Sequence, residues 1–200
     1  MHINNFEVLD LTILTTSCTL VLNFGVSGTT MFNTGDDRFY QKYSEYHDAL
    51  NSKPHLVIIQ FGTNDVMHPA WSESVFVSEY VTFIERFTEL DTCPSVYLIV
   101  PEPSYDDIEE NSDSRMLVKN RINKVLPKLI REIASVTNTV LIDGFSIMGG
   151  NGFTRLDAFG PDNLHLNDLG YIGMAHGIAE SLAEHENFYF ITQKMQSSTA

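Results

Sequence analysis

The sequence predicts an α/β fold, a three-layer α/β/α sandwich around a parallel sheet of the flavodoxin-like kind. Three observations support this prediction. Short, continuous apolar runs recur at intervals of about 40 residues, as expected for strands covered on both faces. The segments between them carry apolar residues at helical spacing. Glycine-containing polar turns follow the runs, at the edge where parallel sheets carry their sites.

The predicted strands are residues 20–24, 56–61, 96–100 and 139–143. Each is a run of Val, Leu, Ile and aromatic residues with a turn residue close behind it. We expect all four to be buried, because strands that alternate with helices in right-handed βαβ units are covered on both faces.

Four segments between and after these runs are predicted to be helices. In the third, Pro127 is expected to kink or restart the helix. The fourth is expected to begin with Asn167 or Asp168 as its cap. The aromatic residues on these helices are interpreted as core packing. The apolar stripes are Phe39, Tyr43, Tyr46 and Leu50; Phe76, Tyr80, Phe83, Phe87 and Leu90; Ile122, Val125, Leu126, Leu129, Ile130 and Ile133; and Ile172, Ala175, Ile178, Ala179 and Leu182.

Length and composition indicate one domain with a sizeable core. The chain has 200 residues, of which 43% are hydrophobic. We expect the domain to span residues 20–188, between an atypical segment 1–19 and a tail 189–200. A formal net charge of −14 argues against nucleic-acid partners and against attraction to anionic lipid, because no basic surface is available to meet phosphates. Oligomeric state stays open.

The cysteine count and the hydropathy exclude several other classes. Cys18 and Cys93 are too few and too isolated for a metal site or a disulfide framework, and we expect both to be buried thiols. No cofactor motif is present. No apolar run reaches the ~20 residues of a membrane helix. No signal peptide is visible, so the default expectation is a cytoplasmic location.

The most informative polar stretch is the turn from Asp162 to His165, just before the last predicted helix. A carboxylate three residues before a histidine on a tight turn can reach one ring nitrogen and fix the tautomer, leaving the other nitrogen as a base. The alternative is a polar loop that only caps a helix.

By contrast, residues 102–115 are interpreted as a solvated rim loop. Its carboxylates are Glu102, Asp106, Asp107, Glu109, Glu110 and Asp113.

Three motifs in register resemble the SGNH hydrolases, also called the GDSL esterase/lipase family. They are Asn-Phe-Gly-Val-Ser-Gly at 23–28, Gly-Thr-Asn-Asp at 62–65 and Asp-x-x-His at 162–165. The resemblance covers about residues 20–185 and is nearest to the carbohydrate and sialate O-acetylesterase branch. It implies a serine-type esterase acting on carboxylic or acetyl esters, including O-acetylated carbohydrates, without a cofactor.

The resemblance also implies residue roles. Gly28 would offer its backbone N–H, and Asn64 its side-chain amide, to the oxyanion of a tetrahedral intermediate. His165 would be the general base, oriented by Asp162. The family's nucleophile is a serine in a Gly-Asp-Ser motif that follows the first strand.

No Gly-Asp-Ser motif occurs in this sequence. Ser17 is a poor substitute, because only three residues separate the run before it from the run that begins at Leu20, too few for a parallel crossover. Two explanations stay open. The chain start is truncated or mis-spliced, or the protein is a degenerate homologue in which residues 6–16 replace the first strand.

Two rival functions are considered. In the first, Ser27 is the nucleophile of a strand-turn-helix elbow, as in α/β-hydrolases. In the second, the chain is an inactive binding module that keeps the pocket of the family. Under every reading His68 and Trp71 are expected to border the pocket, because they follow the Gly-Thr-Asn-Asp motif.

Overall fold

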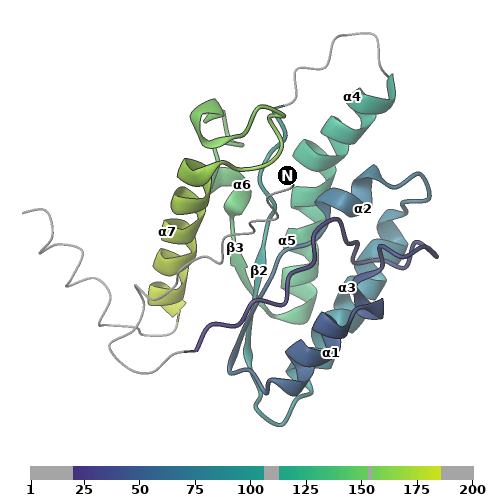
Figure 1. Ribbon diagram of the computed structural model, residues 1–200, viewed down its shortest axis with the longest axis vertical. Helices are drawn as coiled ribbons and strands as arrows, with labels where there is room; N and C mark the ends of the chain where they lie inside the picture. The colour runs from purple at the N-terminus through teal and green to yellow at the C-terminus, as the bar shows by residue number, and fades with distance from the viewer. Residues whose placement is uncertain (1–19, 106–112, 153–154, 186–200) are drawn as a thin grey trace, which may run out of the picture.

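A three-stranded parallel sheet forms the centre of the protein (Figure 1). The computed structural model describes residues 20–105, 113–152 and 155–185. The strands are β1 (Leu56–Ile59), β2 (Ser95–Ile99) and β3 (Val140–Ile142), hydrogen-bonded in the order β1-β2-β3. Three of the four predicted strands are therefore confirmed.

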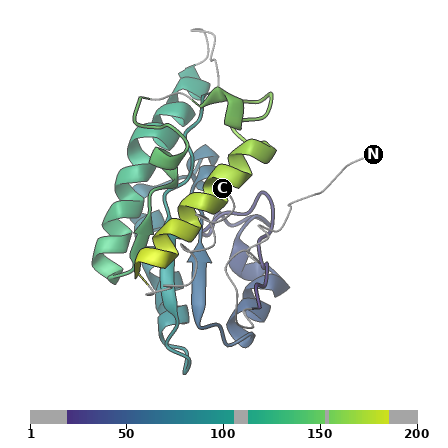
Figure 2. The same cartoon turned by 90° about the vertical axis from the view of Figure 1, so that its left-hand side faces the viewer.

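Helices cover both faces of this sheet, which gives the predicted three layers. Val96 and Leu98 of β2 face a core shared with α1 (Ser44–Asn51), α3 (Glu73–Thr88) and α5 (Leu126–Thr137). Tyr97 and Ile99 point the other way, into a second core against α7 (Asp168–His185). Figure 1 shows α7 on one side of the sheet and α3 and α5 on the other, and Figure 2 shows α7 crossing the sheet obliquely. Alternate residues of one strand thus supply two separate cores.

Short elements complete the connections. Some of them lie next to residues of the candidate site, either between a strand and a long helix or just before α7. The short elements are η2 (Tyr40–Lys42), α2 (Thr63–Met67), α4 (Asp113–Asn120), η3 (Arg121–Val125), α6 (Gly144–Ile147) and η4 (Leu156–Ala158).

The helix prediction around Pro127 is confirmed, with a specific local form. The helix restarts as α5 with Pro127 in its first turn, after the π-helical stretch η3. Proline has no N–H for the carbonyl four residues earlier, which belongs to Asn123. The wider π turn accommodates this missing bond, and such turns often occur at functional sites.

The aromatic residues of α3 are core residues, as predicted. Phe83 stacks on Tyr46 at 5.5 Å between ring centroids and contacts Phe61 and Phe87 edge-on. The stripe on α7 is only partly as predicted. Ile172 is 55% exposed, because it lies two residues away from the buried stripe, which repeats every four residues and consists of Gly170, Met174, Ile178 and Leu182.

The predicted strand at residues 20–24 is wrong. Leu20 is 80% exposed and Leu22 50% exposed, and the segment forms no ladder. A strand needs a neighbour for its N–H and C=O groups. In the part of the chain that the structure describes, no strand pairs with the outer edge of β1, so this segment has nothing to pair with.

The prediction of a buried Cys93 is also wrong, since this thiol is exposed in the turn before β2. Other predictions concern residues outside the described ranges. These are the segment 6–16 with Ser17 and Cys18, most of the acidic loop (Asp106, Asp107, Glu109 and Glu110), and the tail 189–200. Within the described ranges, no helix is both long enough and apolar enough to cross a membrane.

The exposure of residues 20–24 leads to a stability prediction. We expect Leu20→Ala to change the free energy of unfolding by no more than about 0.5 kcal/mol, as for other surface sites. The control Leu98→Ala removes a fully buried side chain and should lower it by about 2–5 kcal/mol. Chemical denaturation of both variants measures this. Equal losses for the two variants would mean that residues 20–24 are packed after all.

Candidate active site

The predicted site residues lie in three places: Gly28 before β1, Asn64 in α2 just after β1, and Asp162 with His165 in the loop before α7. Asn64 lies in the first turn of α2, and its side-chain Nδ2 donates to the carbonyl oxygen of Thr29 at 3.0 Å. An amide NH₂ has two hydrogens, so one remains available for a ligand. The contact also brings the neighbouring Gly28 to Asn64. The structure therefore joins the two predicted oxyanion donors through Thr29.

Gly28 has a conformational reason to be glycine. Its φ is +77°, in the left-handed region that other residues rarely adopt. Among the described residues, no atom lies within 4 Å of the position that a Cβ would occupy, so their packing does not demand glycine there. Gly28 is exposed, and a side chain at this position would extend into open space.

A buried carboxylate that sequence reasoning missed holds this loop in place. Asp65 is fully buried, and its Oδ1 accepts hydrogen bonds from the backbone N–H groups of Met31 at 2.7 Å and Phe32 at 2.9 Å. Burial raises the pKa of Asp65 to about 6, although these two N–H bonds oppose the shift. No group in the described ranges bonds to its Oδ2. The aspartate in Gly-Thr-Asn-Asp was the only available signal.

Asp162 and His165 form the contact that the sequence predicted. His165 Nδ1 lies 2.5 Å from Asp162 Oδ2, and Asp162 Oδ1 accepts from the N–H groups of Leu164 and His165. Partial burial works against ionisation, but the bonds from the His165 ring and from the two N–H groups lower the pKa of Asp162 to about 2. The carboxylate therefore stays charged and engages Nδ1, which leaves Nε2 as the free nitrogen.

A third pair lies at the same edge of the sheet. Gln60, just after β1, donates from Nε2 to Oε2 of Glu102, just after β2, at 2.6 Å. Burial raises the pKa of Glu102, and the bond from Gln60 and the nearby His165 ring partly offset this. Glu102 is half-buried. Within the loop predicted to be a solvated rim, the contact with Gln60 therefore shields the Glu102 carboxylate in part from water.

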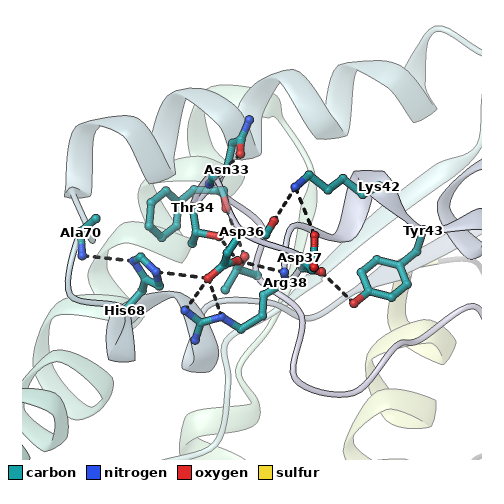
Figure 3. Close-up of polar contacts among 12 residues, drawn as sticks. Asn33, Thr34, Asp36, Asp37, Arg38, Lys42, Tyr43, His68 and Ala70 are labelled. Carbon is teal, nitrogen blue, oxygen red and sulfur yellow. Dashed lines mark hydrogen bonds and ion pairs between the residues drawn. The ribbon is translucent and has the colours of Figure 1, made fainter.

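His68 is anchored in a polar cluster beside α2 (Figure 3). Its Nε2 lies 3.5 Å from Asp36 Oδ2, and its Nδ1 accepts from the N–H of Ala70 at 3.1 Å. Asp36 also accepts hydrogen bonds from the guanidinium of Arg38 and the hydroxyl of Thr34. The Arg38 bond has the larger effect, and together the two bonds hold the pKa of Asp36 well below its usual range. This cluster fixes loop 33–38 against the end of α2.

Trp71 also has a structural anchor. Its ring lies 4.9 Å beneath the guanidinium carbon of Arg121, a cation–π arrangement. Arg121 Nη1 donates to the carbonyl of Val66 at 3.0 Å. Trp71 and Arg121 therefore tie the end of α2 to η3, and whether they touch a ligand stays a prediction.

The alternative nucleophile Ser27 lacks the required geometry. An elbow needs a strand directly before the serine and a helix directly after it. Residues 20–39 are all described and contain neither. The strand-turn-helix interpretation of Ser27 is therefore wrong.

The described residues offer no cluster of metal ligands, and the hollow they form lies away from the candidate site. No three His, Cys, Asp or Glu side chains gather there as they would around an ion. A hollow of about 280 Å³ is lined by Ser95, Val140 and His185, among others. It lies at the starts of β2 and β3, the opposite end of the sheet from Asn64.

Comparison with known proteins identifies relatives of the whole domain. The sequence pattern of the GDSL-like lipase/acylhydrolase family matches residues 13–171. An acetylxylan esterase of Xylanibacter ruminicola is 26% identical over 183 residues. The match covers 81% of this chain but only 35% of the relative, so the chain spans about a third of that protein's length.

Solved structures agree in fold. An acetylxylan esterase from Geobacillus stearothermophilus superposes with a TM-score of 0.57 and 17% identity, over 78% of this chain and 68% of its own. A peptidoglycan O-acetylesterase has the same TM-score and 18% identity, over 70% of this chain and 40% of its own. At these identities the likeness shows a shared fold.

The raised pKa of Asp65 leads to a prediction about pH. The carboxyl group of Asp65 has a pKa of about 6 in the folded protein and 3.8 in the unfolded chain. At pH values between these two, the folded protein therefore binds more protons than the unfolded chain. The contribution of Asp65 to stability is therefore present at about pH 4 and lost as the pH rises through 6, by about 3 kcal/mol in total. We expect the free energy of unfolding of the parent, minus that of Asp65→Asn, to fall by this order between pH 4 and 7.

Denaturation at a series of pH values measures this difference. Subtracting the variant from the parent removes the contributions of the other carboxylates, because both proteins contain them. The exposed-site variant Asp91→Asn serves as the control and should follow the parent. A difference that stays constant or increases with pH would contradict the assignment for Asp65.

Proposed function

Because the chain belongs to the GDSL-like lipase/acylhydrolase family, we propose that it hydrolyses carboxylic esters by serine-type acyl transfer, with acetyl esters of carbohydrates as substrates. The family match shows a family of hydrolases. The acetyl-ester part of the proposal rests on the acetylxylan esterase likeness. The observation that carries the chemistry is the Asp162–His165 contact, at the same edge of the sheet as the Asn64–Thr29 contact.

In this mechanism Gly28 and Asn64 bind the oxyanion. The free amide hydrogen of Asn64 and the N–H of Gly28 donate to the carbonyl oxygen as it gains charge. Such a donor is worth about 3–4 kcal/mol in the barrier, since it meets charge that develops only in the transition state. Asp65 holds the loop and therefore the spacing between the two donors.

His165 moves the protons. Its Nε2 takes the proton of the nucleophilic hydroxyl as that oxygen attacks the carbonyl carbon, and returns it to the alcohol oxygen when the ester bond breaks. A water molecule then repeats the sequence on the acyl-enzyme and releases the acid. Asp162 holds the tautomer in which Nε2 can accept a proton, and it stabilises the imidazolium.

The nucleophile required by this mechanism is a serine on a strand beside β1. The family pattern implies this place, and the outer edge of β1 lacks a partner strand among the described residues. The proposal therefore concerns a form in which a Gly-Asp-Ser strand lies beside β1.

A binding module of the same fold is the second candidate. In the described ranges no hydroxyl is hydrogen-bonded to the His165 ring, whose side chain is 73% exposed. A module without a nucleophile would keep the pocket and bind an ester or a sugar without cleaving it. The presence of a working nucleophile separates the two candidates.

We expect Asn64→Ala to lower kcat and kcat/KM together by about 10²–10³ on nitrophenyl acetate, in a form that carries the serine. The reason is that an oxyanion donor acts mainly in the transition state. Asn51→Ala, at the exposed end of α1, is the matched control and should leave both unchanged. An unchanged kcat for Asn64→Ala would remove this residue from the mechanism.

A second prediction separates the esterase from the binding module. Residues 1–200 alone should not react with a fluorophosphonate probe, whereas the serine-bearing form should be labelled once per chain, as seen by intact mass. Asp162→Asn in that form should keep its thermal transition but lose up to about 10⁴ in kcat, because the wrong tautomer is favoured. Labelling of residues 1–200 at Ser27 would contradict the proposed origin of the nucleophile.

A further inference from the structure

The pair formed by Gln60 and Glu102 has no role in the proposed acyl transfer. The oxyanion donors are Gly28 and Asn64, and the base already has Asp162 as its partner. Gln60 and Glu102 come from the ends of two hydrogen-bonded strands, so they lie side by side at the site edge of the sheet. Removing part of the hydration of a carboxylate costs free energy unless hydrogen bonds or an opposite charge replace the lost water.

The loop that carries Glu102 is rigidly placed. Asn123 of η3 binds both backbone groups of Ser104, donating to its carbonyl and accepting from its N–H, each at 2.8 Å. On the other side, the N–H of Tyr105 donates to the carbonyl of Asn163 at 2.9 Å. The loop is therefore held between the π-helical turn and the turn that presents His165. This holds the loop that carries Glu102 next to the turn that presents His165.

Electrostatic coupling agrees with this placement. The His165 ring lowers the pKa of Glu102, against the larger effect of burial. The charge of Glu102 adds to burial in raising the pKa of Tyr171, on the first turn of α7. Glu102 thus contacts Gln60 directly and interacts electrostatically with His165 and Tyr171.

This arrangement suits the recognition of hydroxyl groups. A carboxylate can accept hydrogen bonds from two hydroxyls, and charge-assisted bonds are about twice as strong as neutral ones. The amide oxygen of Gln60 can accept a further hydrogen bond while its Nε2 donates to Glu102. Several acceptors close together match an alcohol that carries several hydroxyls, and a simple alkyl alcohol would leave them unsatisfied.

We propose that Gln60 and Glu102 bind the hydroxyl groups of a polyhydroxylated alcohol, a sugar, and so select the ester that reaches His165. This inference deepens the proposed function and rests on it for the ester. The inference adds Gln60 and Glu102 as the residues that determine specificity for the alcohol part of the ester. The sugar contact itself requires no chemistry, so it can be tested without a nucleophile.

The test is a calorimetric titration of the 200-residue chain with xylotriose and, separately, with chitotriose. The parent chain should bind at least one of them. Glu102→Ala should weaken that binding by about 10-fold or more, as expected for a lost hydrogen bond to a charged group, and Gln60→Ala by a few-fold. The control Glu89→Ala removes an exposed carboxylate at the opposite end of the sheet and should bind like the parent.

Thermal melts accompany each variant. If Glu102→Ala does not fold, the exposed-site variant Gln60→Ala and the isosteric Glu102→Gln carry the test, each with an expected few-fold loss. Binding that is unchanged in the folded variants would overturn the inference. Absence of binding of both sugars by the parent chain would overturn it as well.

A kinetic experiment separates this inference from the proposed function. In a serine-bearing form, Glu102→Ala should keep its kcat on nitrophenyl acetate, which has no sugar hydroxyls, and lose kcat/KM on acetylated xylotriose. Equal losses on both substrates would overturn the specificity role. Failure of Asn64→Ala to change hydrolysis would count against the acyl-transfer mechanism and leave the sugar titration unaffected.

Discussion

The buried carboxylate of Asp65 is the contact on which the candidate site depends. Together with the Asn64–Thr29 bond, it joins the start of α2 to the loop that contains Met31 and Phe32, more than thirty residues earlier. Asn64 precedes it directly and Gly28 lies three residues before Met31, so the carboxylate sets the relation between them. A buried charged group is tolerated where several donors meet it, and here two N–H groups do.

The other half of the site depends on a backbone constraint. Pro127 cannot donate a hydrogen bond, and the helix before it widens into a π turn. That turn carries Asn123, whose amide holds Ser104 on both sides. The loop from β2 is thus placed against the turn of His165. A residue that looks like a helix breaker in the sequence therefore helps to position Glu102.

The open edge of β1 relates the fold to its chemistry. Leu20 and Leu22 are apolar yet exposed, and the sheet ends at β1 in the described part of the chain. A parallel strand between them would bury both and satisfy the backbone of each neighbour. The carboxyl end of such a strand would lie at the edge where Asn64 and His165 are found. The proposed nucleophile and the unpaired edge therefore concern the same position.

The sequence alone determined the fold class, three strands, the long helices and the Asp162–His165 contact. These features depend on local patterns, namely continuous apolar runs, helical spacing and a three-residue turn, which residues close in the chain carry by themselves. Only the tertiary structure decided the rest. It exposed Leu20 and Leu22, buried Asp65, and turned Glu102 toward Gln60. Each of these outcomes depends on a partner thirty or more residues away, or on the lack of one, and a local pattern does not record such a partner.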